Sequence, residues 1–559
     1  TLDLLQAWLA DERFAGSQLV VVTRGAVAVR PGEVPDLVAA PIRGLVRSAQ
    51  SEHPGRFVAL DLDTDDVPWP ALLASDEPQL ALRDGSAFAP RMRRTTPTDE
   101  TPAGLGGEGT VLVTGGTGGL GALVARHLAT HHHVSHLLLV SRRGAEAPGA
   151  AELVDELAGL GCQAAVASAD VADRDDLARV LAAVPDAHPL TAVVHTAGIL
   201  DDATIETLDA EQLDRVLRPK VDAALHLHEL TAGADLSAFV LFSSAAPLLG
   251  GAGQGNYAAA NAFLDELARS RHAQGQPATS LAWGLWDQTA GMASGVDAAT
   301  FARGARQIRD RLGLLPLTPD EGLALFDAAL GCDGPVLAPA KLDAGALRAA
   351  ARSATLPPTL RGLVKVPAGR RAGGGGSLAT RLASVPEEER DAVVLDLVRA
   401  QVAAVLGHES GDAVDADHEF KDLGFDSLAA VELRNGLTQA SGLRLPATLV
   451  FDHPTPAAVA AHLREQVGVG GVEEGTGAAA AGGQHALADT LGGLMRHARR
   501  QGLDVDNLPL LVEASRLRPT FTGPADLARP VQVLRLAAGE AGTAVPALVC
   551  VPSFLPGSG

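Results

Sequence analysis

The residue best suited to acid–base chemistry is Tyr257, the only tyrosine among 559 residues. It stands in the stretch GQGNYAAAN and begins an apolar run, YAAANAFLDELARS, that predicts a helix. Asn261 follows four residues later, so a helix would place it one turn on, on the same face. A phenol can donate a proton to a developing oxyanion, and an amide beside it can order the transfer. The sequence therefore contains a candidate general acid at the start of a helix.

Two further side chains could complete a site around this phenol. Ser244 ends the apolar run AFVLFSSAA, which predicts a buried strand, and its hydroxyl could hydrogen-bond a substrate oxygen. Lys220 lies in LRPKVDAALHL, one predicted helix before Tyr257 and among apolar residues. Because a free tyrosine titrates near pH ~10, a nearby cation would help Tyr257 to exchange protons at neutral pH. These groups would suit carbonyl reduction if a hydride donor lay beside them.

The glycine-rich turn GGTGGLG, residues 115–121, predicts where such a donor would bind. TVLVT before the turn predicts a strand, ALVARHLAT after it a helix, and HLLLV a second strand that ends in Ser141-Arg142-Arg143. In this context glycines let backbone N–H groups approach a pyrophosphate at the helix N-terminus. NAD sites usually carry an acidic residue at the second strand end, whereas arginines suit a 2′-phosphate, so NADPH is favoured. The alternative for the glycine-rich turn is a purely structural role, and the alternative for Arg142 and Arg143 is that they only face solvent at the strand end.

The alternation of strands and helices predicts the fold class. CQAAVASADV and LTAVVHTAG are further buried-type strands separated by helical stretches. We expect an α/β fold with a Rossmann-like, doubly wound parallel sheet, whose ligands lie beyond the carboxyl ends of the strands. The candidate cofactor-binding residues occupy the glycine turn or strand ends: Thr114, Gly115, Thr117, Gly118, Gly119, Leu120, Gly121, Ser141, Arg142, Arg143, Asp170, Val171, Ala197 and Gly198.

Residues 380–467 predict a separate, small, all-α four-helix bundle. This piece holds 15 acidic and seven basic residues, a net charge of −8. Val394, Val398, Val402 and Val405 form one stripe of an amphipathic helix, and Thr455-Pro456 reads as a cap followed by a first-turn proline. In GFDSL, residues 424–428, Ser427 opens a helix, with Asp426 as a plausible N-cap.

Residues 105–350 resemble the ketoreductase domain of modular type I polyketide synthases, a branch of the short-chain dehydrogenase/reductase superfamily. Gly115, Gly119 and Gly121 match the superfamily's nucleotide pattern. Most of that superfamily has its lysine four residues after the tyrosine, whereas this chain has Asn261 there and a lysine at 220, as polyketide and fatty-acid ketoreductases do. The resemblance implies the catalytic set Ser244, Tyr257, Lys220 and Asn261. It also implies that residues 1–95, with QLVVVT and RFVALDLD and no glycine fingerprint, form the structural subdomain, either complete or truncated at its start.

The motif GFDSL resembles the attachment site of acyl carrier proteins, which implies 4′-phosphopantetheine on Ser427; the alternative is an ordinary helix cap. Residues 351–379 are interpreted as a linker, and 468–559 resemble a linker and the start of a thioesterase, or a linker alone. The resemblance implies reduction of a carrier-bound β-ketoacyl chain by NADPH in polyketide biosynthesis. The implied partners are ketosynthase, acyltransferase and thioesterase domains, a phosphopantetheinyl transferase and a polyketide acyl chain, in a homodimeric synthase.

A stereocontrol loop is carried by the triplet Leu200-Asp201-Asp202. In these ketoreductases such a triplet marks the B-type, which yields the D-configured β-hydroxyl. The A-type has a tryptophan eight residues before the tyrosine, where this chain has Leu249, and the epimerising B subtype has a proline where this chain has Ala259. The alternative is an acidic loop that caps the next helix.

Composition excludes several classes. A formal net charge of −22 argues against nucleic acid as a partner, and no apolar run reaches the ~18 residues of a membrane span. Three dispersed cysteines suit a reducing, cytoplasmic location.

The histidines do not predict a metal site. HHHVSH, residues 131–136, is interpreted as a solvated turn without an acidic partner, and His195 as a packed strand-end histidine, so no metal is expected. The chain lacks an initiator Met and is interpreted as a piece of a longer protein. The alternatives for function are a silent or epimerising reductase fold that acts as a carrier and docking unit, and a fatty-acid synthase segment.

Overall fold

The structure is a computed structural model that describes residues 1–97, 105–287, 297–470 and 548–552, apart from short internal gaps at 354, 365–377, 384, 407, 409, 426, 444 and 447. Residues 365–377 of the predicted linker, and almost all of the predicted linker and thioesterase start at 468–559, lie outside these residues. Of that last piece, only β14 (Leu548–Pro552) and the end of α18 at residues 468–470 are described.

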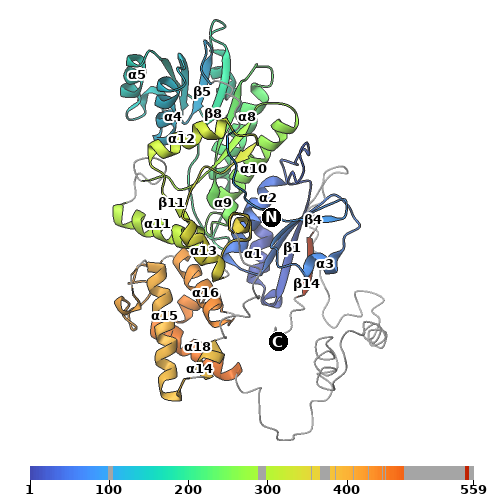
Figure 1. The fold of residues 1–559 in the computed structure, drawn as a ribbon, viewed down its shortest axis with the longest axis vertical. Helices are drawn as coiled ribbons and strands as arrows, with labels where there is room; N and C mark the ends of the chain where they lie inside the picture. The colour runs from blue at the N-terminus through green and yellow to red at the C-terminus, as the bar shows by residue number, and fades with distance from the viewer. Residues whose placement is uncertain are drawn as a thin grey trace. The chain divides into compact units, whose positions relative to one another are not determined.

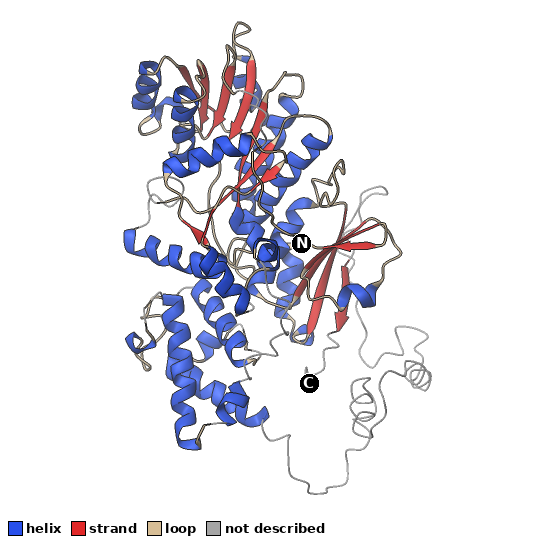
Figure 2. Cartoon of the chain, in the orientation of Figure 1, coloured by secondary structure: helices blue, strands red, loops and turns tan. Residues whose placement is uncertain are grey.

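The central sheet of the catalytic domain is parallel throughout and lies between helices (Figure 2). In spatial order its strands are β12 (Val336–Leu337), β10 (Thr279–Trp283), β9 (Ala238–Ser244), β8 (Leu190–His195), β5 (Thr110–Thr114), β6 (His136–Ser141) and β7 (Gln163–Ser168). The order reverses at β5, which pairs with β6 on one side and with β8 on the other. Ligands of open parallel sheets bind at such a switch point. The predicted doubly wound sheet is confirmed.

The strands are continuous apolar runs because both faces of the sheet are buried. Along β5, Val111 and Val113 belong to the core on one face and Leu112 to the core on the other. The helices and short strands of this domain are α4 (Gly119–Thr130), η2 (Gly144–Glu146), α5 (Ala150–Gly159), α6 (Arg174–Ala182), α7 (Ala210–Leu217), η3 (Arg218–Asp222), α8 (Ala223–Leu230), α9 (Ala245–Leu249), α10 (Gly255–Ala273), α11 (Ala298–Leu312), β11 (Leu314–Leu315), α12 (Pro319–Leu330), β13 (Lys341–Leu342), α13 (Ala344–Arg352) and η4 (Pro358–Leu363).

The N-terminal residues form a second sheet, with the order β14-β1-β2-β3-β4 (Figure 1). Its elements are α1 (Leu2–Ala10), η1 (Glu12–Phe14), β1 (Ser17–Arg24), α2 (Ala40–Glu52), β2 (Phe57–Leu62), α3 (Trp69–Leu73), β3 (Gln79–Arg83) and β4 (Ser86–Phe88). The strands β1, β2 and β3 are parallel, as expected of a Rossmann-like half.

Helix α2 joins this N-terminal subdomain to the catalytic one. At Gly44 a Cβ atom would lie 2.2 Å from the backbone oxygen of Ala258, so only glycine allows α2 to approach α10 this closely. Ala258 directly follows Tyr257. The N-terminal subdomain therefore supports the first turn of the helix that carries the candidate general acid.

The carrier-sized piece is the predicted helical bundle. Its helices are α14 (Leu378–Ala383), η5 (Glu387–Glu389), α15 (Arg390–Leu406), η6 (Gly411–Ala413), α16 (Ser427–Ser441), α17 (Leu449–Asp452) and α18 (Pro456–Gly470). The valine stripe of α15 faces the core, with Val394, Val398 and Val402 fully buried. Thr455 caps α18 by accepting the N–H of Ala458 at 3.1 Å.

Candidate active site

A cavity of about 1310 Å³ lies at the carboxyl ends of the central strands. It is bordered by the glycine turn after β5, the end of β6, the end of β9 and the start of α10. All the candidate site residues of this domain line the cavity except Thr114, Asp201 and Asn261. Segments that lie far apart in the sequence thus meet where the parallel sheet predicts a ligand.

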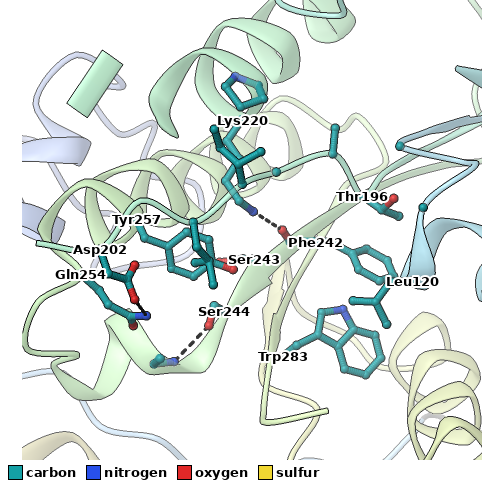
Figure 3. Close-up of a pocket in the computed structure, with 18 of the residues that line it drawn as sticks. Leu120, Thr196, Asp202, Lys220, Phe242, Ser243, Ser244, Gln254, Tyr257 and Trp283 are labelled. Atoms are coloured by element: carbon teal, nitrogen blue, oxygen red, sulfur yellow. Dashed lines mark hydrogen bonds between the residues drawn. The ribbon is translucent and has the colours of Figure 1, made fainter. Parts of the chain in front are cut away.

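Tyr257, Lys220 and Asn261 form one connected group (Figure 3 shows the first two). The Lys220 ammonium donates to the backbone oxygen of Phe242 at 2.8 Å and to Asn261 Oδ1 at 3.0 Å. Asn261 Nδ2 donates to the backbone oxygen of Tyr257 at 2.8 Å. The Lys220 Nζ atom lies 5.2 Å from the centre of the Tyr257 ring. The predicted helical spacing of Tyr257 and Asn261 is therefore realised, and Asn261 links Lys220 to the backbone of Tyr257.

Lys220 reaches this position through irregular backbone. It lies in the π-helical turn η3, between α7 and α8, and single π turns inside helices are frequent at functional sites. Beside it, a Cβ atom on Gly198 would lie 2.8 Å from Lys220 Cε. The glycine after β8 therefore leaves room for the lysine side chain in the conformation that it adopts here.

Burial controls the protonation of both groups. It lowers the pKa of Lys220 to about 7, with Asp265 opposing the shift. It raises the pKa of Tyr257 to about 12, although hydrogen bonds with Asn261 and Ser244 lower it. The sequence led us to expect a cation that eases proton loss from Tyr257 near neutrality. In the structure burial raises the pKa instead, so the phenol keeps its proton and is suited to act as an acid.

Ser244 is the last residue of β9, and its Oγ accepts the N–H of Ala246 at 3.3 Å. Figure 3 shows Ser244, Tyr257 and Lys220 arriving from three different elements around one space. A ketone oxygen placed between the serine hydroxyl and the phenol could accept hydrogen bonds from both.

The glycine turn has the geometry of a phosphate cradle. Gly115 has φ +69°, a left-handed conformation that favours glycine. At Gly121 a Cβ atom would lie 2.2 Å from the backbone oxygen of Gly115, so the start of α4 packs directly onto the turn. Backbone N–H groups at such a helix start can bind a pyrophosphate.

The end of β6 suits a 2′-phosphate. The buried Oγ of Ser141 has no hydrogen-bond partner among the residues that the structure describes, and Ser141 lines the cavity. Arg142 and Arg143 are exposed beside it, and neither forms an ion pair within the described parts of the chain. An unsatisfied hydroxyl and two unpaired guanidinium groups are the donors that a phosphate monoester requires. These residues fit NADPH.

Of the other predicted cofactor residues, some line the cavity and one, Thr114, lies behind it. Asp170 and Val171 line the cavity after β7, and Asp170 lies 3.6 Å from Arg218. Thr114, by contrast, is fully buried, and its hydroxyl bonds His195 Nδ1 at 2.7 Å. Burial lowers the pKa of His195 to about 3. His195 is therefore a packed neutral histidine, as the sequence predicted, and Thr114 supports the strand ends without facing the cavity.

The predicted stereocontrol loop is tied down at both aspartates. Asp201 forms an ion pair with Arg215, and Asp202 accepts from Gln254 Nε2 at 3.0 Å. Leu200 is 42% exposed, although it lines the cavity. Because Gln254 precedes Tyr257 by three residues, the loop and the catalytic helix are held to each other.

Ser427 is the first residue of α16. Gly424, at the start of the motif, has φ +86°, which explains why glycine stands there. The predicted cap Asp426 lies outside the described residues. The structure thus places Ser427 at the start of a helix, as the sequence predicted.

One expectation about the histidine-rich segment was wrong. His132 has an acidic partner, Asp327 of α12, which the fold brings from far along the sequence. Asp327 Oδ1 lies 2.8 Å from the Nε2 atoms of both His127 and His132. Although burial opposes it, these bonds lower the pKa of Asp327. The cluster holds α12 against α4, and the expected absence of a metal stays a prediction.

Sequence reasoning missed two polar residues beside Tyr257. Asn256 is buried; its Nδ2 donates to the backbone oxygen of Asp201 at 2.7 Å, and its Oδ1 accepts the N–H of Tyr257 at 2.8 Å. Gln254 holds Asp202. Both lie in the stretch GQGNY, where two amides around a phenol were the available signal.

Comparison with known proteins bears on this site. Three family models match the chain: the KR domain at residues 109–288, the Rossmann fold domain of the polyketide synthase extender module SpnB at residues 1–92, and the phosphopantetheine attachment site at residues 396–463. A solved A-type ketoreductase from a modular polyketide synthase is 44% identical, with a TM-score of 0.56 over 61% of this chain and 72% of that one. This chain belongs to the ketoreductases of modular polyketide synthases. A second solved relative, an A1-type ketoreductase, is 42% identical, with a TM-score of 0.59 over 65% of this chain and 76% of its own.

Curated relatives place the ketoreductase and its carrier domain within much larger enzymes. Polyketide synthase GfsA of Streptomyces halstedii is 52% identical over 476 residues, which is 83% of this chain and 6% of that protein. The spectinabilin polyketide synthase system protein NorA' of Streptomyces orinoci is 53% identical over 474 residues, 83% of this chain and 13% of that protein. This chain therefore spans a small part of their length. Among the described residues, no helix has the length and apolar character that a membrane crossing requires.

Proposed function

We propose that the ketoreductase reduces a β-ketoacyl thioester, carried on phosphopantetheine at Ser427, to the β-hydroxyacyl thioester with NADPH. The observation that carries this proposal is the convergence of Tyr257, Lys220 and Ser244 on one cavity, beside the glycine turn. NADPH bound in that turn supplies a hydride to the ketone carbon. The protein's own residues must then orient the ketone and deliver one proton to its oxygen.

Tyr257 delivers that proton. Its hydroxyl stays protonated at physiological pH because burial raises its pKa. As the C=O bond becomes C–O, the phenolic proton moves to the oxygen and leaves a phenolate. When Lys220 is protonated, its Nζ atom, 5.2 Å from the ring centre, stabilises that negative charge. Ser244 hydrogen-bonds the same substrate oxygen, and Asn261 keeps Lys220 in place and orders the return of a proton.

Residues Ser141, Arg142 and Arg143 support NADPH as the cofactor. The buried, unpartnered hydroxyl of Ser141 and the two guanidinium groups would bind the 2′-phosphate that NADH lacks. The glycine turn would hold the pyrophosphate of either cofactor, so the choice between them rests on the end of β6.

The product is proposed to be the D-configured β-hydroxyl. Support comes from the B-type triplet Leu200-Asp201-Asp202, two members of which line the cavity. Leu249 stands where an A-type domain has tryptophan, and Ala259 where an epimerising B-type domain has proline. The two solved relatives above are described as A-type and A1-type, so the configuration has to be measured on this domain itself.

The carrier domain delivers the substrate. Modification of Ser427 by a phosphopantetheinyl transferase would tether the acyl chain, and a flexible tether gives an effective concentration on the order of mM at the cavity. The acidic surface of the carrier suits basic docking partners. We further propose that ketosynthase, acyltransferase and thioesterase domains of a homodimeric synthase precede and follow these steps, and that residues 468–559 lead into the thioesterase.

Two alternatives remain distinguishable. A reductively silent or epimerising domain would lack part of the catalytic set, whereas Ser244, Tyr257 and Lys220 all line the cavity here. A fatty-acid synthase segment would carry the same two domains, so only the substrates that the protein accepts can distinguish it from a polyketide synthase segment.

The test is loss of NADPH absorbance when the protein receives a β-ketoacyl thioester, followed by chiral analysis of the product. We expect NADPH consumption that NADH supports poorly, and a D-configured product. An absence of consumption at saturating thioester would refute the reductase assignment and favour a silent or epimerising unit. An L-configured product would refute the stereochemical proposal alone.

A further inference from the structure

Glu52, the last residue of α2, connects the N-terminal subdomain to both loops that flank the site. Its side chain is fully buried. One carboxylate oxygen accepts the N–H of Ile205 at 2.6 Å, and the other accepts the N–H of Gly253 at 2.9 Å. Ser48, one turn earlier on α2, donates to Glu52 at 3.2 Å and lies 2.6 Å from the backbone oxygen of Gly251.

The two N–H groups belong to the segments that shape the catalytic cavity. Ile205 follows the Leu200–Asp202 triplet by three residues, and Gly253 precedes Tyr257 by four. The segments also bond each other, because the N–H of Ala203 donates to the backbone oxygen of Gly253 at 2.8 Å. Glu52 thus lies behind the junction of the two loops and holds both.

Burying a carboxyl group at this position lowers the stability of the fold unless its oxygens accept hydrogen bonds. Burial, aided by nearby Glu206, raises the pKa of Glu52 to about 7, although the hydrogen bonds from Ile205, Gly253 and Ser48 oppose the shift. Within the described residues the carboxyl has no ion pair, and Arg434 donates to the backbone oxygen of Glu52 rather than to its carboxyl group. An uncompensated buried acid is destabilising unless its oxygens accept hydrogen bonds. Its two backbone bonds therefore identify what the side chain does.

We propose that Glu52 is a positioning residue that sets the relation between the stereocontrol loop and Tyr257, and so determines which face of the ketone the site accepts. The inference rests on the proposed reductase function. It assigns a part in stereochemical fidelity to a subdomain that has no nucleotide turn of its own.

Glu52→Gln tests this proposal, because an amide offers one acceptor oxygen and places an N–H donor against the second backbone N–H. The matched control is Glu266→Gln on α10: Glu266 is also buried, its pKa is also raised to about 7, and it accepts the N–H of Ala28 at 3.3 Å, away from the two loops. The measurements are kcat, KM, the ratio of the two β-hydroxy epimers, NADPH affinity and the unfolding temperature.

We expect Glu52→Gln to lower kcat by about tenfold, since small displacements of reacting groups have effects of that order, and to raise the share of the minor epimer. NADPH affinity should be unchanged. Glu266→Gln should lower the unfolding temperature without changing the epimer ratio.

If Glu52→Gln does not fold, Ser48→Ala tests the proposal instead. This variant removes the hydrogen bond between Ser48 and Glu52, so it should shift the epimer ratio in the same direction. A wild-type kcat and epimer ratio in the folded variant, or an equal shift in Glu266→Gln, would overturn the proposal. Failure of the reductase assignment would look different, because the wild-type protein itself would then consume no NADPH.

Discussion

Replacing Tyr257 by phenylalanine removes one oxygen and leaves the rest of the site in place. The ring is 6% exposed and packs with Val216 and Ala260, and phenylalanine fills the same space. Loss of one hydrogen-bonded hydroxyl should change the free energy of unfolding by about 1 kcal/mol. Loss of a general acid should lower kcat by about 10²–10⁴-fold, or about 3–5 kcal/mol of barrier. The effect on the reaction is thus several times the effect on folding.

The assay compares the initial rate of NADPH consumption with NADPH affinity in the same preparation. NADPH affinity should be near normal, because the residues expected to bind NADPH lie on other elements than Tyr257. The glycine turn follows β5 and Arg142 follows β6, whereas Tyr257 lies on α10. The unfolding temperature serves as the control for folding. A variant that retains more than about a third of the wild-type kcat would refute the role of the phenol, since no other tyrosine exists in the chain. A parallel loss of affinity would mean that the substitution disturbed the cavity instead.

Three further predictions address other parts of the molecule. Ser427→Ala should abolish the gain of a phosphopantetheine in intact mass after incubation with CoA and a transferase; an unchanged gain would place the attachment elsewhere. Gly121→Ala should weaken NADPH binding at least about tenfold, because its Cβ would lie 2.2 Å from the backbone oxygen of Gly115. In Gly159→Ala the added Cβ would meet open space, so NADPH affinity should be normal and the free energy of unfolding should rise by up to about 1 kcal/mol. Equal NADPH affinities in the two variants would contradict the role given to Gly121. Finally, the pKa of Lys220 is lowered to about 7 from an ordinary 10.5, so between these values only the unfolded chain binds its proton and the folded state gains stability as pH rises. Urea unfolding at several pH values should therefore show wild type gaining on Lys220→Met across that range; a constant difference would argue against the lowered pKa.

Local patterns predicted the elements of this fold well, because they depend on neighbours in the sequence. The apolar run before the glycine turn is β5, and the valine stripe of residues 394–402 faces the core of the carrier bundle. The spacing of Tyr257 and Asn261 predicted their proximity, since four residues make one helical turn. The apolar surroundings of position 220 and the resemblance to known ketoreductases both indicated Lys220 as the partner, although it lies too far away in sequence for a rule of helical spacing.

Contacts between distant segments could not be predicted in the same way. Asp327 was not expected beside the histidines because 195 residues separate it from His132. Thr114 was expected at the cofactor, but its side chain points to a neighbouring strand, and strand order decides which face a terminal residue meets. The raised pKa of Tyr257 was likewise not foreseen, since desolvation depends on everything packed around the ring.

The sequence by itself determined the chemistry that this protein has available: one phenol, a glycine turn that only glycines can form, two arginines after a strand, and a serine at a helix start. These are properties of residue type and short-range spacing, which the chain keeps in any fold. Tertiary structure alone decided how they are used. Parallel strand order brought the side chains to one edge of the sheet, and burial set which of them keep their protons. The close approach of α2 to α10 placed Glu52 of one subdomain behind the loops of the other, because only packing brings together groups that are far apart along the chain.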